Sequence, residues 1–308
     1  MLRVVFMGSP EFAVPTLRAV ARVAEIVGVI TQPDKPAGRG QTLVAPAVKQ
    51  AAAELLPGVP VLQPKSARRP ELAEEIRALA PDVGVVVAYG KILPQSLLDV
   101  PRHGCLNVHG SLLPRYRGAA PIQWAVIRGE SETGITIMQL DAGMDTGPML
   151  LRRAEPVSDE DTAGTLAARL APIGAELMVE ALAALAEGKL APVPQDDALA
   201  TMAPILKKED GLVDWSQPAR AVRDRVRGVD PWPGAYTLLG GQPLKLWGAR
   251  LADGVGSPGD VLGVSAAGLA VACGEGAITI AEVQAPGRKR MAATAYHAGR
   301  SLAGIRLG

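Results

Sequence analysis

The chain has 308 residues, a length that favours two domains, and 48% of its residues are hydrophobic while 20% are charged. That balance is typical of a packed globular protein and excludes a disordered chain. The 32 basic and 31 acidic residues nearly cancel, which excludes a uniformly basic surface.

Strand-like and helix-like segments alternate through the first half of the chain. Short apolar runs predict strands at 2–7, 26–31, 59–62, 82–88, 104–108, 134–140 and 149–151. Apolar residues at helical spacing predict helices at 11–23, 46–56, 70–79, 119–128 and 162–187. This alternation predicts an α/β fold, with a Rossmann-like, mostly parallel sheet and helices on both of its faces. Ligands of such sheets bind beside the carboxyl ends of the strands.

The character of the sequence changes after Gly188. Residues 190–205 are irregular and contain prolines, which predicts a linker between a domain over 1–189 and a second domain over 206–308. In the second domain a helix at 218–228 precedes five short strands, predicted at 236–239, 244–249, 261–264, 269–272 and 277–283. Short strands separated by glycines at this spacing predict a small, OB-like β-barrel.

The predicted second domain is basic. Residues 206–308 carry 13 basic and 9 acidic groups, a net charge of +4, which favours a polyanionic partner. Four of the basic groups lie on the predicted helix at 218–228: Arg220, Arg223, Arg225 and Arg227. These arginines could equally form an ordinary solvated helix face, so the charge alone does not decide between the two interpretations.

Few residues are available for metal or thiol chemistry. The chain has two cysteines and three histidines, and it lacks the closely spaced Cys and His pairs of a structural zinc site, so we expect no metal. Cys105 and Cys273 are interpreted as buried thiols in a reducing compartment. Because no apolar run approaches the roughly 20 residues of a membrane span and no signal peptide is evident, we expect a cytoplasmic protein.

Asn107 and His109 are candidate catalytic residues at the end of the predicted 104–108 strand. Residues two apart in a strand project to the same side, so the two side chains can act on one group. An amide and an imidazole can both donate hydrogen bonds to a developing oxyanion, and the imidazole can also move a proton near neutral pH. The alternative is a core histidine that bonds a backbone carbonyl.

A glycine-rich loop over 141–147 follows the predicted 134–140 strand and carries Asp141 and Asp145. Either carboxylate could orient a nearby imidazole or accept a proton, although solvated acids in an Asp-Gly turn are also common. Other motifs are missing. The chain has no glycine-rich dinucleotide fingerprint, no P-loop and no nucleophile elbow, so neither a dehydrogenase nor a P-loop ATPase is supported.

Residues 107–118 together with 141–147 resemble the signature of the folate-dependent formyltransferases. Further matches to this family lie at 6–12, 32–40, 85–94 and 230–234, so the resemblance runs from residue 4 to about residue 290. The 32–40 loop and the predicted barrel are similar to the branch of the family that acts on aminoacylated tRNA.

The resemblance implies transfer of a formyl group from 10-formyltetrahydrofolate to the α-amino group of methionyl-initiator-tRNA, without a metal. Such amines titrate at about 7.7–8.0, so a large fraction is already neutral and able to attack. In the family, the residues matching Asn107 and His109 stabilise the tetrahedral oxyanion. The residue matching Asp145 orients the imidazole and helps the proton to reach the leaving nitrogen.

The resemblance also implies the binding surfaces. The folate is expected in a groove formed by Val87, Tyr89, Gly90, Ile92, Leu93, Ser111, Leu112, Leu113, Pro114 and Asp141, with Ile92, Leu93 and Leu112 as apolar walls. The turn-rich loop over 31–49 carries Lys35, Arg39 and Lys49, and in the family it reaches the acceptor stem of the tRNA. Without the resemblance, a solvated loop would explain these charges equally well.

Three other functions remain open at this stage. A formyltransferase acting on glycinamide ribonucleotide would lack the second domain, and one acting on an amino sugar nucleotide would not need the basic loop. A non-catalytic tRNA-binding protein would leave Asn107, His109 and Asp145 without a purpose. We expect the protein to be a monomer.

Overall fold

The computed structural model describes residues 1–37, 42–302 and 304–308. Its internal contacts divide the chain into two compact units. The first comprises Met1–Pro121, Thr133–Glu155 and Ala167–Pro204, and the second comprises Ile122–Glu132, Pro156–Leu166 and Ile205–Gly308. The second unit therefore includes two short segments from the first half of the sequence. Of the predicted linker over 190–205, residues 190–204 belong to the first unit and Ile205 to the second.

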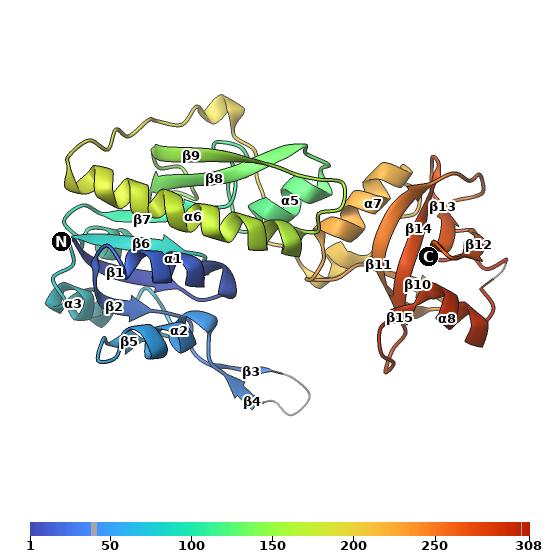
Figure 1. Ribbon diagram of the computed structural model, residues 1–308, viewed down its shortest axis with the longest axis horizontal. Helices are drawn as coiled ribbons and strands as arrows, with labels where there is room; N and C mark the ends of the chain where they lie inside the picture. Colours follow the sequence, from blue (N-terminus) through green and yellow to red (C-terminus); the bar gives the residue numbers. More distant parts are fainter. Residues whose placement is uncertain (38–41, 303) are drawn as a thin grey trace. The chain divides into compact units, whose positions relative to one another are not determined.

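A seven-stranded sheet with the order β5-β2-β1-β6-β7-β8-β9 forms the centre of the first unit (Figure 1). Its strands are β1 (Arg3–Gly8), β2 (Glu25–Ile30), β5 (Val61–Leu62), β6 (Val83–Val87), β7 (Cys105–His109), β8 (Glu132–Gln139) and β9 (Met149–Pro156). The pairs from β5 to β7 are parallel, whereas β8 is antiparallel to β7. The carboxyl ends of the five parallel strands therefore meet at one edge, as the sequence predicted.

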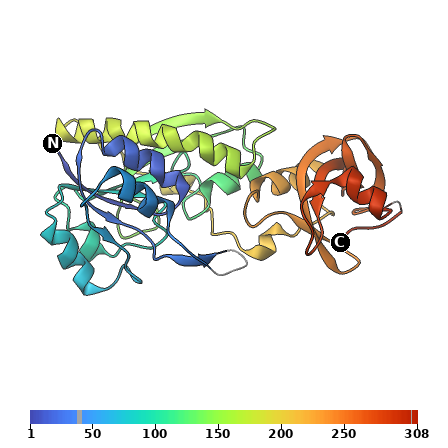
Figure 2. The ribbon, with the colours of Figure 1, turned by 60° about the horizontal axis from the view of Figure 1, so that its bottom comes forward.

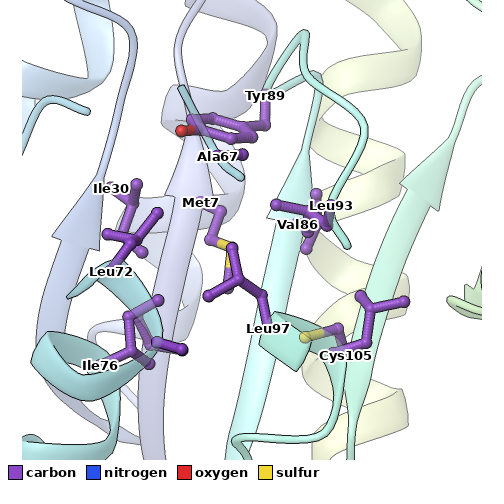
Figure 3. Packing of buried hydrophobic residues seen from close by; sticks show 13 residues of the cluster. Met7, Ile30, Ala67, Leu72, Ile76, Val86, Tyr89, Leu93, Leu97 and Cys105 are labelled. Atoms are coloured by element: carbon purple, nitrogen blue, oxygen red, sulfur yellow. The ribbon is translucent and has the colours of Figure 1, made fainter. Parts of the chain in front are cut away.

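Helices cover both faces of this sheet. They are α1 (Val14–Val20), which follows the short helix η1 (Glu11–Ala13), α2 (Ala47–Leu55), α3 (Pro70–Ala78), α4 (Gln95–Leu98) and α6 (Ala163–Ala186). Helix α5 (Pro121–Ile127) belongs to the second unit except for its first residue. Apolar residues at helical spacing give α3 one buried face, which includes Leu72 and Ile76. Figure 3 shows α3 and α4 packed over Met7, Val86 and Cys105, with α6 on the opposite face of the sheet.

The basic loop folds partly into a hairpin that the sequence did not predict. Strands β3 (Lys35–Ala37) and β4 (Thr42–Val44) pair in antiparallel fashion. Lys35 is exposed at the start of the hairpin, whereas Arg39 lies outside the described residues.

The second unit contains α7 (Ala219–Gly228), α8 (Ala293–Gly299) and a six-stranded sheet that Figure 2 shows to be strongly curved. The strands are β10 (Tyr236–Leu239), β11 (Gln242–Ala252), β12 (Val261–Ser265), β13 (Gly268–Ala272), β14 (Ala277–Gln284) and β15 (Met291–Ala292). They pair in antiparallel fashion in the order β10-β11-β14-β13-β12, with β15 on β14. The predicted fold class, a parallel-rich α/β sheet followed by a separate antiparallel β structure, is therefore confirmed.

Two of the four arginines of α7 are not part of a solvated face, whereas Arg220 is exposed and Arg225 is half-buried. Arg223 and Arg227 are buried, and both donate to Oδ1 of the buried Asp224, from Nε at 2.9 Å and from Nη2 at 3.0 Å respectively. Arg227 also donates through Nη1 to the carbonyls of Ser158 and Asp161 at 2.8 and 3.0 Å. These two arginines therefore hold the second unit together, and their charges are already paired within it.

Within the described residues, none of the helices combines the length and the apolar character that a bilayer-spanning segment requires.

Replacing Asp224 with Ala should destabilise the second unit by about 3–5 kcal/mol, because two buried guanidinium groups would lose their shared carboxylate. All four tryptophans (Trp124, Trp215, Trp232 and Trp247) lie in this unit, so their fluorescence during urea unfolding measures the effect. Glu275→Gln, at an exposed position of the same unit, serves as the control and should change stability by less than about 0.5 kcal/mol. An equally small effect of Asp224→Ala would contradict the prediction.

The two thiols should be unreactive in the folded protein. Burial raises the pKa of Cys105 to about 12 and that of Cys273 to about 11, so little thiolate exists at pH 8. We expect Ellman's reagent to detect two thiols per chain only after unfolding in guanidinium chloride. Rapid reaction of the native protein would show that one of these side chains is accessible.

Candidate functional site

Asn107 and His109 lie near the carboxyl end of β7, at the edge of the sheet where the parallel strands end. Alternate residues of this strand face opposite sides. Cys105 packs in the cluster under α3 and α4, and Val108 faces α6, where a Cβ added to Gly174 would lie 2.7 Å from Val108 Cγ1. Asn107 and His109 therefore share the face of Cys105, as the two-residue spacing predicted.

The ring of His109 is 4% exposed and has partners at both nitrogens. Nε2–H donates a hydrogen bond to the carbonyl oxygen of Tyr116 at 2.9 Å. A carbonyl can only accept, so Nε2 carries the proton, and Nδ1 lies 3.6 Å from Oδ2 of Asp145. Nδ1 is therefore the ring atom that can take up or release a proton beside a carboxylate. The sequence left two interpretations of His109 open, and both describe part of the ring. Nε2 bonds a backbone carbonyl, as in a core histidine, whereas Nδ1 is placed for catalysis.

Asp145 is held in an unusual backbone conformation. Its φ is +54°, in the left-handed region that residues other than glycine rarely adopt. Its Oδ2 atom accepts a hydrogen bond from the backbone N–H of Gly118 at 2.8 Å, and its side chain is 17% exposed. The carboxylate is thus fixed beside the imidazole while keeping some access to solvent.

The side-chain amide of Asn107 makes no hydrogen bond to any of the described residues, although only 8% of the residue is exposed. A nearly buried amide without a protein partner can donate to a ligand that enters from the open edge of the sheet. This property matches the donor role that the sequence predicts for Asn107.

The predicted folate residues that follow β6 divide into two groups. The side chains of Tyr89 and Leu93 lie in the hydrophobic core rather than in an open groove (Figure 3), and burial raises the pKa of Tyr89 to about 12. Val87 is fully buried, whereas Gly90 and Ile92 are exposed. Among the predicted folate residues of this segment, Gly90 and Ile92 can therefore face a ligand directly, and the others can do so through backbone groups.

The turn over 111–114 is rigid because its polar groups bond one another. The Ser111 hydroxyl donates to the carbonyl of Arg115 at 2.6 Å. The hydroxyl of Thr136 donates to the Ser111 carbonyl at 2.7 Å and accepts from Leu113 N–H at 3.1 Å. Leu113 is fully buried, so Leu112 and Pro114, both half-buried, are the side chains that this turn can offer to a ligand.

Asp141 shapes its own loop. Its carboxylate accepts from Gly143 N–H at 3.0 Å and from the Thr146 hydroxyl at 2.8 Å. Asp145, rather than Asp141, is the carboxylate that lies beside the imidazole of His109.

Lys49 forms a half-buried ion pair with Asp34. Its ammonium lies 2.8 Å from Oδ2 of Asp34 and donates to Oε1 of Gln63 at 2.8 Å. Hydrogen bonds from Gln63 and Lys49 lower the pKa of Asp34, which keeps the carboxylate charged. Lys49 therefore anchors the base of the β3–β4 hairpin, and because 34% of its side chain is exposed, its contact with the tRNA stays a prediction.

Several residues that build the site escaped the sequence interpretation. Tyr116 and Gly118 contribute through their backbones. Gln195 donates through Nε2 to the carbonyls of Asp145 and Gly147 at 2.8 and 2.7 Å, from a segment about fifty residues further along the chain. The signal available in the sequence was a polar side chain within an extended, proline-containing stretch.

Among the residues that the structure describes, no three His, Cys, Asp or Glu side chains are grouped so that they could hold a metal ion.

Comparisons with known proteins identify the family of this chain. The family model described as formyl transferase matches residues 2–182, and the model described as formyl transferase, C-terminal domain, matches residues 205–301. The methionyl-tRNA formyltransferase of Geobacter sulfurreducens is 55% identical, over 100% of this chain and 97% of the relative. That of Myxococcus xanthus is 49% identical, over 98% of this chain and 96% of the relative.

Solved structures share the fold at low identity. HypX from Aquifex aeolicus in complex with tetrahydrofolic acid aligns with a TM-score of 0.66 at 19% identity, covering 99% of this chain and 48% of that one. The methionyl-tRNA formyltransferase from Clostridium thermocellum aligns with a TM-score of 0.61 at 16% identity, over 92% of this chain and 99% of that one. Given the family matches to both parts of the sequence and the full-length relatives, this chain belongs to the formyl transferase family.

Proposed function

We propose that this protein transfers the formyl group of 10-formyltetrahydrofolate to the α-amino group of methionyl-initiator-tRNA, giving formylmethionyl-tRNA for translation initiation. Relatives that bear the name of this activity are 49–55% identical over nearly their whole length. The observation that carries the chemistry is the imidazole of His109, whose Nδ1 lies beside Asp145 on the face of the strand that also presents Asn107.

The reaction forms a bond between the α-nitrogen and the formyl carbon and breaks the bond from that carbon to N10 of the folate. The proton released by the attacking amine ends on N10, so charge and atoms balance. In the tetrahedral intermediate, the Asn107 amide and a protonated Nδ1 of His109 donate to the oxyanion. Asp145 stabilises the imidazolium and orients it, and it assists the proton transfer between the two nitrogens.

We assign catalysis to the region over 1–189, a connecting role to 190–205 and tRNA binding to 206–308. The net charge of +4 over 206–308 supports this assignment, even though Arg223 and Arg227 are internally paired. Lys35, Arg39 and Lys49 are the proposed contacts of the loop with the acceptor stem, and Lys49 also fixes the base of that loop. We further propose that the enzyme acts in the cytoplasm as a monomer.

The folate is proposed to lie against the exposed Ile92 and the half-buried Leu112 and Pro114, near the backbone of Gly90. Because the side chains of Tyr89 and Leu93 lie in the core, these two residues can contact the folate through their backbone atoms. An apolar wall beside exposed peptide groups suits a pterin, because its ring needs both a stacking surface and a fixed set of hydrogen-bond partners.

An amino sugar nucleotide is the alternative acceptor. A sugar 3N-formyl transferase, WlaRD, shares the fold with a TM-score of 0.68, but it is only 15% identical to this chain. Incubation of the enzyme with labelled 10-formyltetrahydrofolate and either methionyl-tRNA or a dTDP-linked amino sugar separates the two functions. Formylation of the sugar alone would reject our proposal.

Asn107→Ala should lower kcat by about 10²–10³-fold, because the oxyanion would lose one preorganised donor. The rate of labelled formyl transfer to methionyl-tRNA measures the effect, and binding of the folate should change much less. His103→Gln, at the opposite end of β7, is the control and should leave the rate unchanged. Full activity of Asn107→Ala would remove the amide from the mechanism.

Arg39→Ala and Lys35→Ala should each raise the KM for methionyl-tRNA and leave the KM for the folate unchanged. Each lost phosphate contact should reduce the slope of log affinity against log salt concentration by about 1. Lys189→Ala, which removes an exposed cation from the end of α6, is the matched control. Unchanged tRNA kinetics at physiological salt in both loop variants would exclude the proposed contact.

A further inference from the structure

Residues 193–203 form a mostly irregular segment of the first unit, with one short helix η2 (Asp197–Leu199), which we call the strap. At one end the strap pairs with β9, where Met149 and Val193 exchange backbone hydrogen bonds of 2.9 and 2.8 Å. At the other end Arg117 N–H donates to the Thr201 carbonyl at 2.8 Å, and Ala203 N–H donates to the Arg117 carbonyl at 2.7 Å. The strap is therefore attached to the first unit on both sides of the candidate site.

Gln195 uses its whole amide group within the site. Its Nε2 donates to the carbonyls of Asp145 and Gly147 at 2.8 and 2.7 Å, while its Oε1 accepts from Nε of Arg117 at 2.9 Å. Arg117 is 7% exposed and is also bonded through Nη2 to Asp197 of the strap at 2.7 Å. Glutamate at this position would lack both donors, and asparagine would be one methylene too short.

Thr201 bonds Tyr116, whose carbonyl is the partner of His109 Nε2. Its hydroxyl oxygen accepts a hydrogen bond from Tyr116 N–H at 2.9 Å. The carbonyl of the same Tyr116 accepts the Nε2–H of His109. Thr201 thus bonds Tyr116, the partner of Nε2 of the ring, and Gln195 bonds Asp145, which lies beside Nδ1.

Both residues that the strap holds have strained backbones. Tyr116 has a φ of +64° and Asp145 a φ of +54°, and these are two of the four described residues other than glycine in that region. Such conformations cost about 1–3 kcal/mol each and persist only where the surroundings enforce them. The bonds from Thr201 and Gln195 supply part of that enforcement.

We propose that Gln195 and Thr201 are positioning residues that fix the orientation and tautomer of His109 from the strap. Through Tyr116 they keep the proton on Nε2, and through Asp145 they keep a carboxylate beside Nδ1. The role in catalysis rests on the proposed function, whereas the effect on the ring is a property of the protein alone.

The test at Thr201 compares two substitutions. Thr201→Val preserves the shape but removes the acceptor for Tyr116 N–H, whereas Thr201→Ser keeps the hydroxyl. We expect Thr201→Val to lower kcat by about 10–100-fold with both KM values within threefold of wild type, and Thr201→Ser to restore kcat to within threefold. The pH profile of kcat should shift in Thr201→Val and remain unshifted in Thr201→Ser.

The test at Gln195 distinguishes the role of the donor Nε2 from that of the acceptor Oε1. Gln195→Glu keeps an acceptor for Arg117 but loses both donors to the 145–147 loop, and Gln195→Met loses all three bonds. We expect equal losses of kcat in both variants, and near-normal activity of Gln195→Glu would overturn the role of the donors. Asp196→Asn, whose side chain bonds only Ala198 N–H at 3.0 Å, is the control on the same strap.

A spectroscopic measurement tests the ring without any substrate. With three histidines in the chain, ¹⁵N-histidine labelling gives a simple spectrum in which His109 is assigned by its substitution. At a pH where the ring is neutral, wild type should show the proton on Nε2, and Thr201→Val should show a mixture of tautomers. If the variants lowered Tm but left kcat, the pH profile and the His109 signals unchanged, the strap would have a structural role alone and the proposal would be wrong. If the wild type failed to formylate methionyl-tRNA while these signals changed as expected, only the proposed function would fall.

Discussion

A carbonyl oxygen can only accept a hydrogen bond, and this simple constraint organises the candidate site. The carbonyl of Tyr116 lies against Nε2 of His109 and therefore fixes the proton on that nitrogen. The remaining nitrogen, next to Asp145, is left for chemistry. A backbone atom thus decides which side of the imidazole can act, and this holds whatever the protonation state of the ring at a given pH.

The sheet makes this arrangement possible by bringing distant segments to one edge. Parallel pairing from β5 to β7 aligns the carboxyl ends of five strands, and the loops that follow them carry the groups that a ligand can reach. Close packing of α6 on Val108, which the absence of a side chain at Gly174 permits, sets the other face of β7. The face that carries Asn107 and His109 is consequently fixed by packing on both sides of the strand.

Much of the fold could be predicted because its signals are local. Apolar runs mark buried strands such as β6, and helical spacing of apolar residues marks α3. The β3–β4 hairpin and α8 were missed, because their short segments have no comparable apolar pattern. The antiparallel direction of β8 depends on the path of the chain and carries no signal in the strand itself.

The candidate site was predictable to the extent that its residues are close in sequence. The spacing of Asn107 and His109 places both on one face of β7, and the resemblance to a family singled out Asp145. The partners of these groups were not predictable, since Tyr116 acts through its backbone and Gln195 arrives from a distant segment. The partners of Lys49 were likewise not predictable, because Asp34 and Gln63, which bond its ammonium, carry no signal of that pairing in the sequence.

The second unit consists of three separate stretches of the sequence, and this limits how it can be cut from the chain. A fragment that began at residue 205 would leave behind Ser158 and Asp161, whose carbonyls receive the buried guanidinium of Arg227. In such a fragment the Nη1 group of Arg227 would lose both of these acceptors. A version of the second unit intended to fold alone therefore needs the 156–166 segment as well as α7.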